Sequence, residues 1–306
     1  MNNNPLRVNL AGLQLENPTA LASGILGYSP ESLQRIAEAG AGAVVTKSIG
    51  LKPRMGYPNP TVVQANCGII NAMGLPNPSI TEYTSEINFT KTLIKIPIIV
   101  SVYGYSAEEY TKVTKAAAEA GAAAVELNVS CPHVKETGSE IGQNPKLLKQ
   151  VVHQVKTATN KPVIVKLSPN VTDIIELAQA ATNAGADALT ATNTVRAIAI
   201  DTETARPILS NTRGGLSGPA IKPIALRAVY DIYEQVKTPI IGCGGITTWQ
   251  DAVEFLLAGA TAIQIGTAIA THDPTVFQAV TRGIQAYLKK KKYRSIKEIV
   301  GQAHRN

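Results

Sequence analysis

The stretch IPIIVSVYGYSAEEYTKVTKAAAEAGAAAVELNVS, Ile96–Ser130, contains one complete unit of the predicted fold. It begins and ends with β-branched apolar runs, which are typical of parallel strands covered on both faces. Between these runs, Ser106 is followed by two acidic residues and several alanines, and the pattern ends at Gly121. This is the pattern of a helix with an N-cap serine and a C-terminal glycine. The stretch therefore predicts a strand, a helix and a second, parallel strand.

The same alternation runs along the whole chain. Further helical patterns that end in glycine occupy residues 29–40, 170–185 and 247–259. Eight strand–helix units predict a (β/α)8 TIM barrel, which typically takes about 250 residues. A doubly wound open sheet is the alternative, but the count of eight and the lack of an early Gly-x-Gly-x-x-Gly motif argue against it. The predicted strands lie at Pro18–Gly24, Ala41–Ile49, Ile96–Gly104, Ala122–Ser130, Pro162–Ser168, Ala186–Thr194, Pro239–Gly245 and Ala262–Ala268.

The remaining length of the 306-residue chain is expected in two places. Residues 8–18, VNLAGLQLENP, have the pattern of a β-hairpin, which we expect at the bottom of the barrel. Residues 50–79 are rich in Pro, Gly and Asn and form a long insertion after the second strand. We expect residues 1–306 to form a single domain around this barrel.

Composition limits the functional classes. No apolar run reaches the 18 or so residues of a membrane span, and the N-terminus has no apolar signal region. The three cysteines, Cys67, Cys131 and Cys243, are too few and too widely spaced for a disulfide framework, a four-cysteine metal site or an iron–sulfur cluster. These features favour the cytoplasm. The net charge of +7 suits an enzyme that collects anionic ligands, or an RNA-binding protein, while the basic run at 287–294 is expected to be a solvated helix end.

Function in a barrel lies where the strands end and the βα loops begin. Two lysines there require a reason, because a buried ammonium group is costly without an anionic partner. Each glycine alone would indicate only a tight turn, but glycines at two adjacent strand ends let the backbone approach a phosphate. Together they predict a phosphorylated ligand. The strand-end residues are Ser23, Gly24, Lys47, Ser48, Ser101, Asn128, Ser130, Cys131, Lys166, Ser168, Asn193, Thr194, Gly244, Gly245, Gly266 and Thr267.

Two of the cysteines lie near strand ends and receive different interpretations. Cys243, inside an apolar run, is expected to be a small core residue. Cys131 lies beyond its strand, directly before a proline, at the start of a polar, glycine-containing loop. Such a loop could close over a ligand, and a thiol beside cationic lysines could act as a nucleophile or a general base. The residues alone leave open whether Cys131 has a chemical role.

Several segments resemble class 1 dihydroorotate dehydrogenases, most closely the NAD-linked subtype in its archaeal form. The resemblance covers about Val8 to Ala270. It implies a barrel that binds FMN and oxidises dihydroorotate to orotate in pyrimidine synthesis. The segments are NVSCPHVK, INAMGLPNPS, VTKSIG, TATNTVRAIAIDTETARPIL and RGGLSGPAIKPIALR.

The resemblance also implies roles for individual residues. Cys131 matches the base that removes a proton from C5 of dihydroorotate while a hydride leaves C6 for flavin N5. Lys47 matches a catalytic lysine that contacts both flavin and substrate. The implied substrate-binding residues are Lys47, Asn71, Met73, Gly74, Leu75, Asn128, Asn193 and Thr194. The implied FMN-binding residues are Ser23, Lys47, Ser48, Asn128, Lys166, Gly218, Gly244, Gly245, Gly266 and Thr267.

Three residues depart from the common pattern of that family. His133 stands where many members have an asparagine that binds orotate, and it could pair with the substrate carboxylate or face solvent. Ser101 stands where an asparagine often contacts flavin, and Arg196 is an unusual charge near the substrate-binding residues. The sequence SCPH also resembles dihydropyrimidine dehydrogenases, which act on uracil and thymine.

Two further alternatives come from other classes. A tRNA dihydrouridine synthase would fit the basic charge, but only about 36 residues follow the last strand, which is short for an additional RNA-binding domain. A Schiff-base aldolase would use Lys47 or Lys166. The resemblance to dihydroorotate dehydrogenases implies a separate electron-transfer subunit with FAD and an iron–sulfur cluster, and a homodimer of this chain. We expect no nucleic acid or membrane partner. The electron acceptor, NAD through that subunit or fumarate, stays open.

Overall fold

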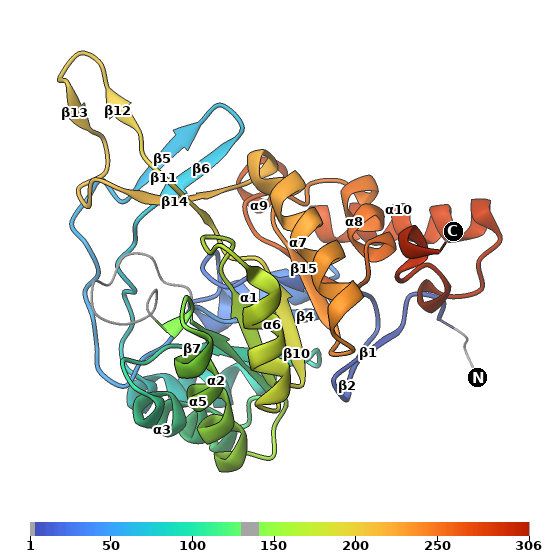
Figure 1. Ribbon diagram of the computed structural model, residues 1–306, viewed down its shortest axis with the longest axis horizontal. Coiled ribbons are helices and arrows are strands. Elements are labelled where there is room, and N and C mark those ends of the chain that lie inside the picture. The colour runs from blue at the N-terminus through green and yellow to red at the C-terminus, as the bar shows by residue number, and fades with distance from the viewer. Residues whose placement is uncertain (1–3, 130–140, 306) are drawn as a thin grey trace.

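The computed structural model describes residues 4–129 and 141–305. Its centre is a closed barrel of eight strands, each parallel to its neighbours and arranged in chain order, so the TIM-barrel prediction is confirmed (Figure 1). Each strand overlaps a predicted range, and the last one begins two residues early. The strands are β3 (Thr19–Leu21), β4 (Ala43–Val45), β7 (Ile98–Val102), β8 (Ala124–Asn128), β9 (Val163–Leu167), β10 (Ala188–Ala191), β15 (Ile240–Cys243) and β16 (Ala260–Ile265).

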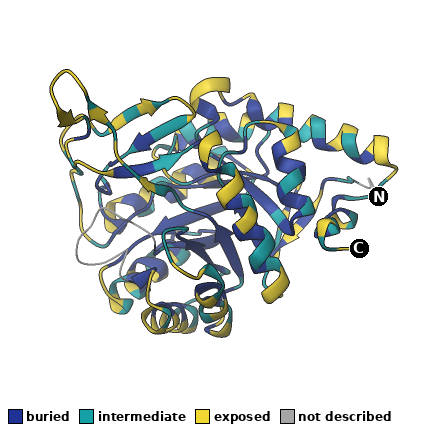
Figure 2. Ribbon diagram, turned by 45° about the horizontal axis from the view of Figure 1, so that its top comes forward, coloured by how far each residue is buried: buried dark blue, intermediate teal, exposed yellow. Residues whose placement is uncertain are grey.

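Helices surround the barrel, with buried faces toward the strands and exposed faces outward (Figure 2). Helix α3 begins after Ser106, whose Oγ accepts a hydrogen bond from the N–H of Glu109 as an N-cap. Helix α5 buries Leu148, Val151, Val152 and Val155, a spacing of three and four that gives one apolar stripe. The helices are α1 (Pro30–Glu38), α2 (Ile80–Leu93), α3 (Ala107–Glu119), α5 (Pro145–Ala158), α6 (Ile174–Asn183), α7 (Lys222–Gln235), α8 (Trp249–Leu257), α9 (Ile269–His272) and α10 (Val276–Lys291).

The N-terminal hairpin consists of β1 (Val8–Leu10) and β2 (Leu13–Leu15), paired antiparallel. Leu10 and Leu15 are fully buried and belong to the main hydrophobic core. In Figure 1 the hairpin lies on the side of the barrel away from β5 and β6. At the other end of the chain, the lysines that close α10 are exposed, as expected for a solvated helix end.

A second, four-stranded antiparallel sheet covers one end of the barrel, in the order β11-β14-β6-β5 (Figure 1). The insertion after β4 supplies β5 (Val62–Ala65) and β6 (Gly68–Asn71). Residues 195–217 supply β11 (Val195–Ala197) and β14 (Gly214–Ser217), and between them a projecting arm formed by β12 (Ile200–Asp201) and β13 (Arg206–Pro207).

This second source of strands corrects the sequence analysis, which expected extra length only at the N-terminus and after the second strand. The missed strands are two to four residues long, too short to show the alternation by which strands are recognised. The sheet has its own small core of Ile70, Ala72 and Leu209.

Among the described residues, no helix has both the length and the apolar character needed to cross a bilayer.

Candidate active site

A cavity of about 390 Å³ lies at the carboxyl ends of the barrel strands, beside the four-stranded sheet. Its volume is within the range of small-molecule sites. Every described residue that the family resemblance implies for cofactor or substrate lines it. The strand-end residue Ser168 is buried but does not line it, and Ser130, Cys131 and His133 lie outside the described residues. The lining residues implied by the resemblance are Ser23, Lys47, Ser48, Asn71, Met73, Gly74, Leu75, Asn128, Lys166, Asn193, Thr194, Gly218, Gly244, Gly245, Gly266 and Thr267.

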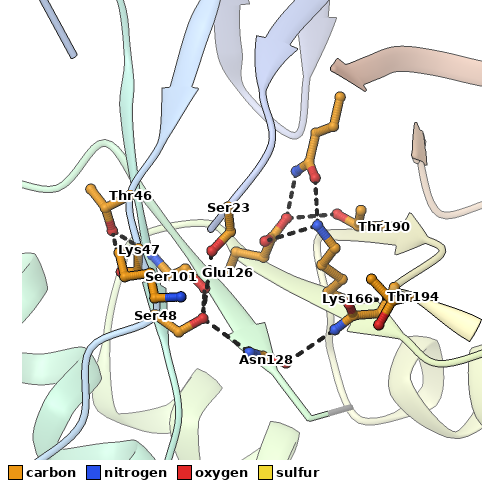
Figure 3. Close-up of polar contacts among 12 residues, drawn as sticks. Ser23, Thr46, Lys47, Ser48, Ser101, Glu126, Asn128, Lys166, Thr190 and Thr194 are labelled. Carbon is orange, nitrogen blue, oxygen red and sulfur yellow. Dashed lines mark hydrogen bonds and ion pairs between the residues drawn. The ribbon is translucent and has the colours of Figure 1, made fainter. Parts of the chain in front are cut away.

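One wall is a chain of hydroxyl and amide groups centred on Ser48 (Figure 3). Ser48 Oγ lies 2.9 Å from Ser101 Oγ and 3.5 Å from Ser23 Oγ, and it accepts a hydrogen bond of 2.9 Å from Asn128 Nδ2. Asn128 Oδ1 in turn accepts from Asn193 Nδ2 at 3.3 Å. These residues follow or end different strands, so the barrel geometry brings them together. The chain of bonds fixes which way the Asn128 amide points, and the Ser101 hydroxyl, at one end of the chain, can act as a donor or an acceptor.

The floor contains a buried charge network that crosses the barrel interior (Figure 3). Lys166 Nζ donates to Gln264 Oε1 at 2.8 Å and lies 3.8 Å from Glu126 Oε1. Gln264 Nε2 donates to Glu126 Oε2 at 2.6 Å, and Thr190 Oγ1 donates to the same oxygen at 2.9 Å. Lys166 therefore has an anionic partner within the protein. For Lys166, part of the anionic partner that the sequence analysis required is thus supplied by the barrel itself.

The thiol of Cys243 also faces this network. The sequence analysis assigned it to the core, and it is buried, but it lines the cavity as well. Burial raises the pKa of the Cys243 thiol, with Lys166 acting in the opposite direction, so the thiol stays protonated at neutral pH. Burial disfavours the charge of Lys166, but the neighbouring Cys243 and Glu126 outweigh this and raise the pKa of the ammonium group. Of these two neighbours Glu126 is the carboxylate, and its Oε1 lies 3.8 Å from Lys166 Nζ.

The insertion after β4 forms the opposite wall, with Asn71 at the end of β6 and then Met73, Gly74 and Leu75. Gly74 has a φ of +73°, and a Cβ there would lie 2.7 Å from the backbone nitrogen of Tyr57. Only glycine fits this close approach without displacing the chain. The Gly74 carbonyl accepts a hydrogen bond from Arg54 Nε at 3.2 Å. Residue 74 is thus held to two other residues of the insertion, Tyr57 by close packing and Arg54 by a hydrogen bond.

The loops after β15 and β16 line the cavity with Gly244, Gly245, Gly266 and Thr267. Within the described part of the chain, the N–H groups of Gly244, Gly245, Gly266 and Thr267 donate to no backbone carbonyl. Asp251 supports the first loop, and its Oδ2 accepts from the N–H groups of both Thr247 and Thr248, at 3.0 and 2.8 Å. Successive N–H groups of this kind suit an anion such as phosphate.

The surroundings of Asp251 stabilise the ionised form of its carboxyl group. Burial opposes the charge, but hydrogen bonds from Lys222, Thr247 and Thr248 outweigh it and lower the pKa of Asp251 to about 2. Lys222 Nζ lies 2.7 Å from Asp251 Oδ1 and 2.9 Å from Glu254 Oε2. At neutral pH the loop after β15 is therefore anchored by a fully ionised carboxylate.

Sequence reasoning missed several residues of the site, among them Gln264 and Ser217, which line the cavity, and Glu126, which bonds to Gln264. Glu126 and Gln264 lie inside strands rather than at their ends, and Ser217 lies in the unpredicted strand β14. A signal was present, because Glu126 is two residues before Asn128 and Gln264 two before Gly266, which places each pair on one strand face. Arg196, which the sequence placed near the substrate-binding residues, is exposed in β11.

A model of the dihydroorotate dehydrogenase family matches residues 5–288. The chain belongs to this family. Relatives described as the catalytic subunit of dihydroorotate dehydrogenase B (NAD(+)) include those of Pyrococcus abyssi, 55% identical over 97% of this chain and 99% of the relative, and of Pyrococcus furiosus, 53% identical over 98% and 99%. That of Methanosarcina mazei is 48% identical over 98% of this chain and 95% of the relative. The resemblance inferred from the motifs is confirmed.

Proposed function

We propose that this chain is an FMN-dependent catalytic subunit that oxidises dihydroorotate to orotate. The observation that carries the proposal is the single cavity in which every described residue implied for cofactor or substrate meets. Membership of the dihydroorotate dehydrogenase family supports this reaction over those of the tRNA dihydrouridine synthases and the Schiff-base aldolases.

The cavity has the chemistry that FMN requires. A phosphate group suits the N–H groups of the loops after β15 and β16, which donate to no backbone carbonyl in the described part of the chain. An isoalloxazine ring presents both donors and acceptors, which suit Ser23, Ser48 and Asn128. Gly24 lines the cavity, and a Cβ there would meet nothing within 4 Å, so the space in front of it is open. When bound, FMN would accept a hydride from the substrate.

The chain's own residues would then bind and orient the reactants. The ammonium groups of Lys47 and Lys166 would favour negative charge at the cofactor and the substrate. Asn71, Asn128 and Asn193 would pair with the amide donors and acceptors of the dihydroorotate ring. A buried site of this kind rejects analogues that leave its polar groups unpaired.

Cys131 is proposed to take the proton from C5 of dihydroorotate. It follows Asn128, the last residue of β8, by three positions, and Asn128 itself lines the cavity. A thiol with an ordinary pKa of about 8.5 needs only a modest decrease to act as a base near neutral pH. The lysines of the site would favour that decrease.

The relatives' designation as catalytic subunits supports a separate electron-transfer subunit. We propose that this subunit carries FAD and an iron–sulfur cluster, that the present chain forms a homodimer, and that both act in the cytoplasm. A sucrose-gradient or light-scattering mass of the isolated chain would test the dimer, with a monomeric mass contradicting it.

The reaction is tested by anaerobic rapid mixing of the flavin-loaded protein with dihydroorotate, followed by the visible absorbance of the flavin. We expect rapid bleaching with dihydroorotate and slow bleaching with dihydrouracil. The reverse preference would favour a dihydropyrimidine dehydrogenase, the second candidate raised by the SCPH sequence. Extraction of the cofactor and its mass would distinguish FMN from FAD.

The same experiment assigns the base. In Cys131→Ala the bleaching rate is expected to fall by about 100-fold or more, since a positioned base typically contributes that much. Cys67→Ala is the matched control, because Cys67 is exposed in the turn between β5 and β6 and should leave the rate unchanged. Retained fast bleaching in Cys131→Ala would remove Cys131 from the mechanism.

A further inference from the structure

One charged group of the barrel interior has no part in the function proposed above. Glu126, in the middle of β8, has no exposed surface. Its side chain lies inside the barrel, where it accepts hydrogen bonds from Thr190 and Gln264. A carboxylate in such a place is costly unless it is paired and hydrogen-bonded, so its presence requires a compensating role.

The hydrogen bonds of Glu126 fix the orientation of a second side chain. An ionised carboxylate only accepts hydrogen bonds, so the NH2 group of Gln264 must be the part that faces Glu126 Oε2, at 2.6 Å. The Gln264 carbonyl oxygen is thereby turned toward Lys166 Nζ, at 2.8 Å. Because β8 and β9 are not neighbours of β16 in the barrel, both bonds cross its interior. Gln264 thus links the carboxylate to the ammonium group from the far side of the barrel.

The position of Lys166 is held from three sides. Glu126 faces it from the adjacent strand β8, Gln264 from β16 and Cys243 from β15. Of the described titratable groups that face Lys166, Glu126 is the carboxylic acid, while burial raises the pKa of the Cys243 thiol. Lys166 is 5% exposed and lines the cavity. Lys166 therefore lies between Glu126 and the cavity.

We propose that Glu126, acting directly and through Gln264, is a positioning residue that keeps Lys166 protonated and directed at the bound flavin. The proposal rests on the proposed function, because it names the flavin as the group that Lys166 serves. An ammonium group next to reduced flavin stabilises its negative charge and raises its reduction potential. Without the carboxylate, less would oppose the burial of the Lys166 ammonium group, and its pKa would fall.

The first test is the midpoint potential of the bound flavin as a function of pH, in the wild type and in Glu126→Gln. In Glu126→Gln, Lys166 loses its proton at lower pH than in the wild type. At pH values above the pKa of Lys166 in this variant, the binding of reduced flavin relative to oxidised flavin is expected to weaken at least tenfold. This corresponds to a decrease of about 30 mV in the midpoint potential for a two-electron couple. Lys166→Met gives the limit of complete loss of the ammonium group. Thr190→Val removes one hydrogen bond to Glu126 but keeps its charge, so it should follow the wild-type curve.

A second measurement needs no cofactor. Flavin-free protein is labelled with acetic anhydride across a pH series, and the modification of Lys166 is followed by peptide mass spectrometry. Neutral amines react and ammonium groups do not, so the midpoint of labelling reports the pKa of Lys166. We expect this midpoint to move to lower pH in Glu126→Gln, and by less in Gln264→Leu, which keeps the carboxylate. Should Glu126→Gln fail to fold, Gln264→Leu still provides both measurements.

The outcomes separate this proposal from the function itself. Potentials and labelling midpoints that match the wild type in both variants would overturn the role of Glu126. A wild-type protein that binds no flavin would overturn the proposed function, while the labelling experiment would still report whether Glu126 holds the charge of Lys166.

Discussion

Replacing Asp251 by asparagine tests how the loop after β15 is held. Asp251 joins two parts of the structure, because one oxygen receives Lys222 Nζ at 2.7 Å and the other receives the N–H groups of Thr247 and Thr248. Asparagine has nearly the same shape, but it carries no charge, and its amide group can supply only one acceptor oxygen to these donors. The substitution therefore removes charge and hydrogen bonding with little change in packing.

The size of the effect follows from the carboxyl group's own titration. Its pKa falls from an ordinary value of 3.8 to about 2 in the folded protein, and at 1.36 kcal/mol for each pKa unit this corresponds to about 2 kcal/mol of stability. Because the folded-state pKa is lowered, that stability is fully present above about pH 4. It is lost as the pH falls toward 2, where the carboxyl becomes protonated in the folded state as well.

The assay is urea unfolding of the two proteins at neutral pH and at steps down to about pH 3. Asp251→Asn is expected to lose about 2 kcal/mol at neutral pH, and the difference from the wild type should shrink as the solution becomes acidic. Glu254→Gln is the matched control, because Glu254 also pairs with Lys222, at 2.9 Å, but its side chain is 44% exposed. It should lose less than about 1 kcal/mol. Equal losses in the two variants, or a loss for Asp251→Asn that does not change with pH, would refute the reasoning.

Three further substitutions test the walls of the cavity. Gly74→Ala places a Cβ against Tyr57 and displaces this wall. It should raise the KM for dihydroorotate about tenfold or more while the flavin content stays normal. A normal KM would show that this wall does not contact substrate. Gly24→Leu adds a side chain beside open space at a φ of +104°, which favours glycine, so the protein should lose some stability, measured by urea unfolding, and contain little flavin, measured by its visible absorbance; full flavin content would place the cofactor elsewhere. Ser48→Ala removes the acceptor shared by Asn128 and should weaken flavin binding by about tenfold, measured by fluorescence titration; unchanged affinity would mean that the Ser48 wall has no part in binding.

The barrel could be predicted because its signals are local. Most of the strands are short apolar runs, and glycine marks the end of most preceding helices, as at Gly40 and Gly121. The barrel rule that function lies at the carboxyl strand ends then located Lys47, Asn128 and Lys166 without knowledge of their contacts. The structure places all three in one cavity.

The parts that could not be predicted depend on contacts between distant segments. Strand β14 is a four-residue segment that becomes a strand by pairing with β6 and β11. Glu126 and Gln264 are 138 positions apart. In the sequence, each is a single polar residue within an apolar run, with nothing to indicate its partner. Their partnership, and with it the internal counter-charge of Lys166, is created only when the barrel closes.

One cavity is proposed to hold flavin and substrate together, and the sharpest test is titration of the oxidised flavoprotein with orotate. If the product binds against the flavin between the Asn128 and Gly74 walls, the visible flavin spectrum should change and saturate at one orotate per chain, with a much weaker response in Gly74→Ala. Orotate binding, detected by calorimetry, that leaves the flavin spectrum unchanged would contradict the account.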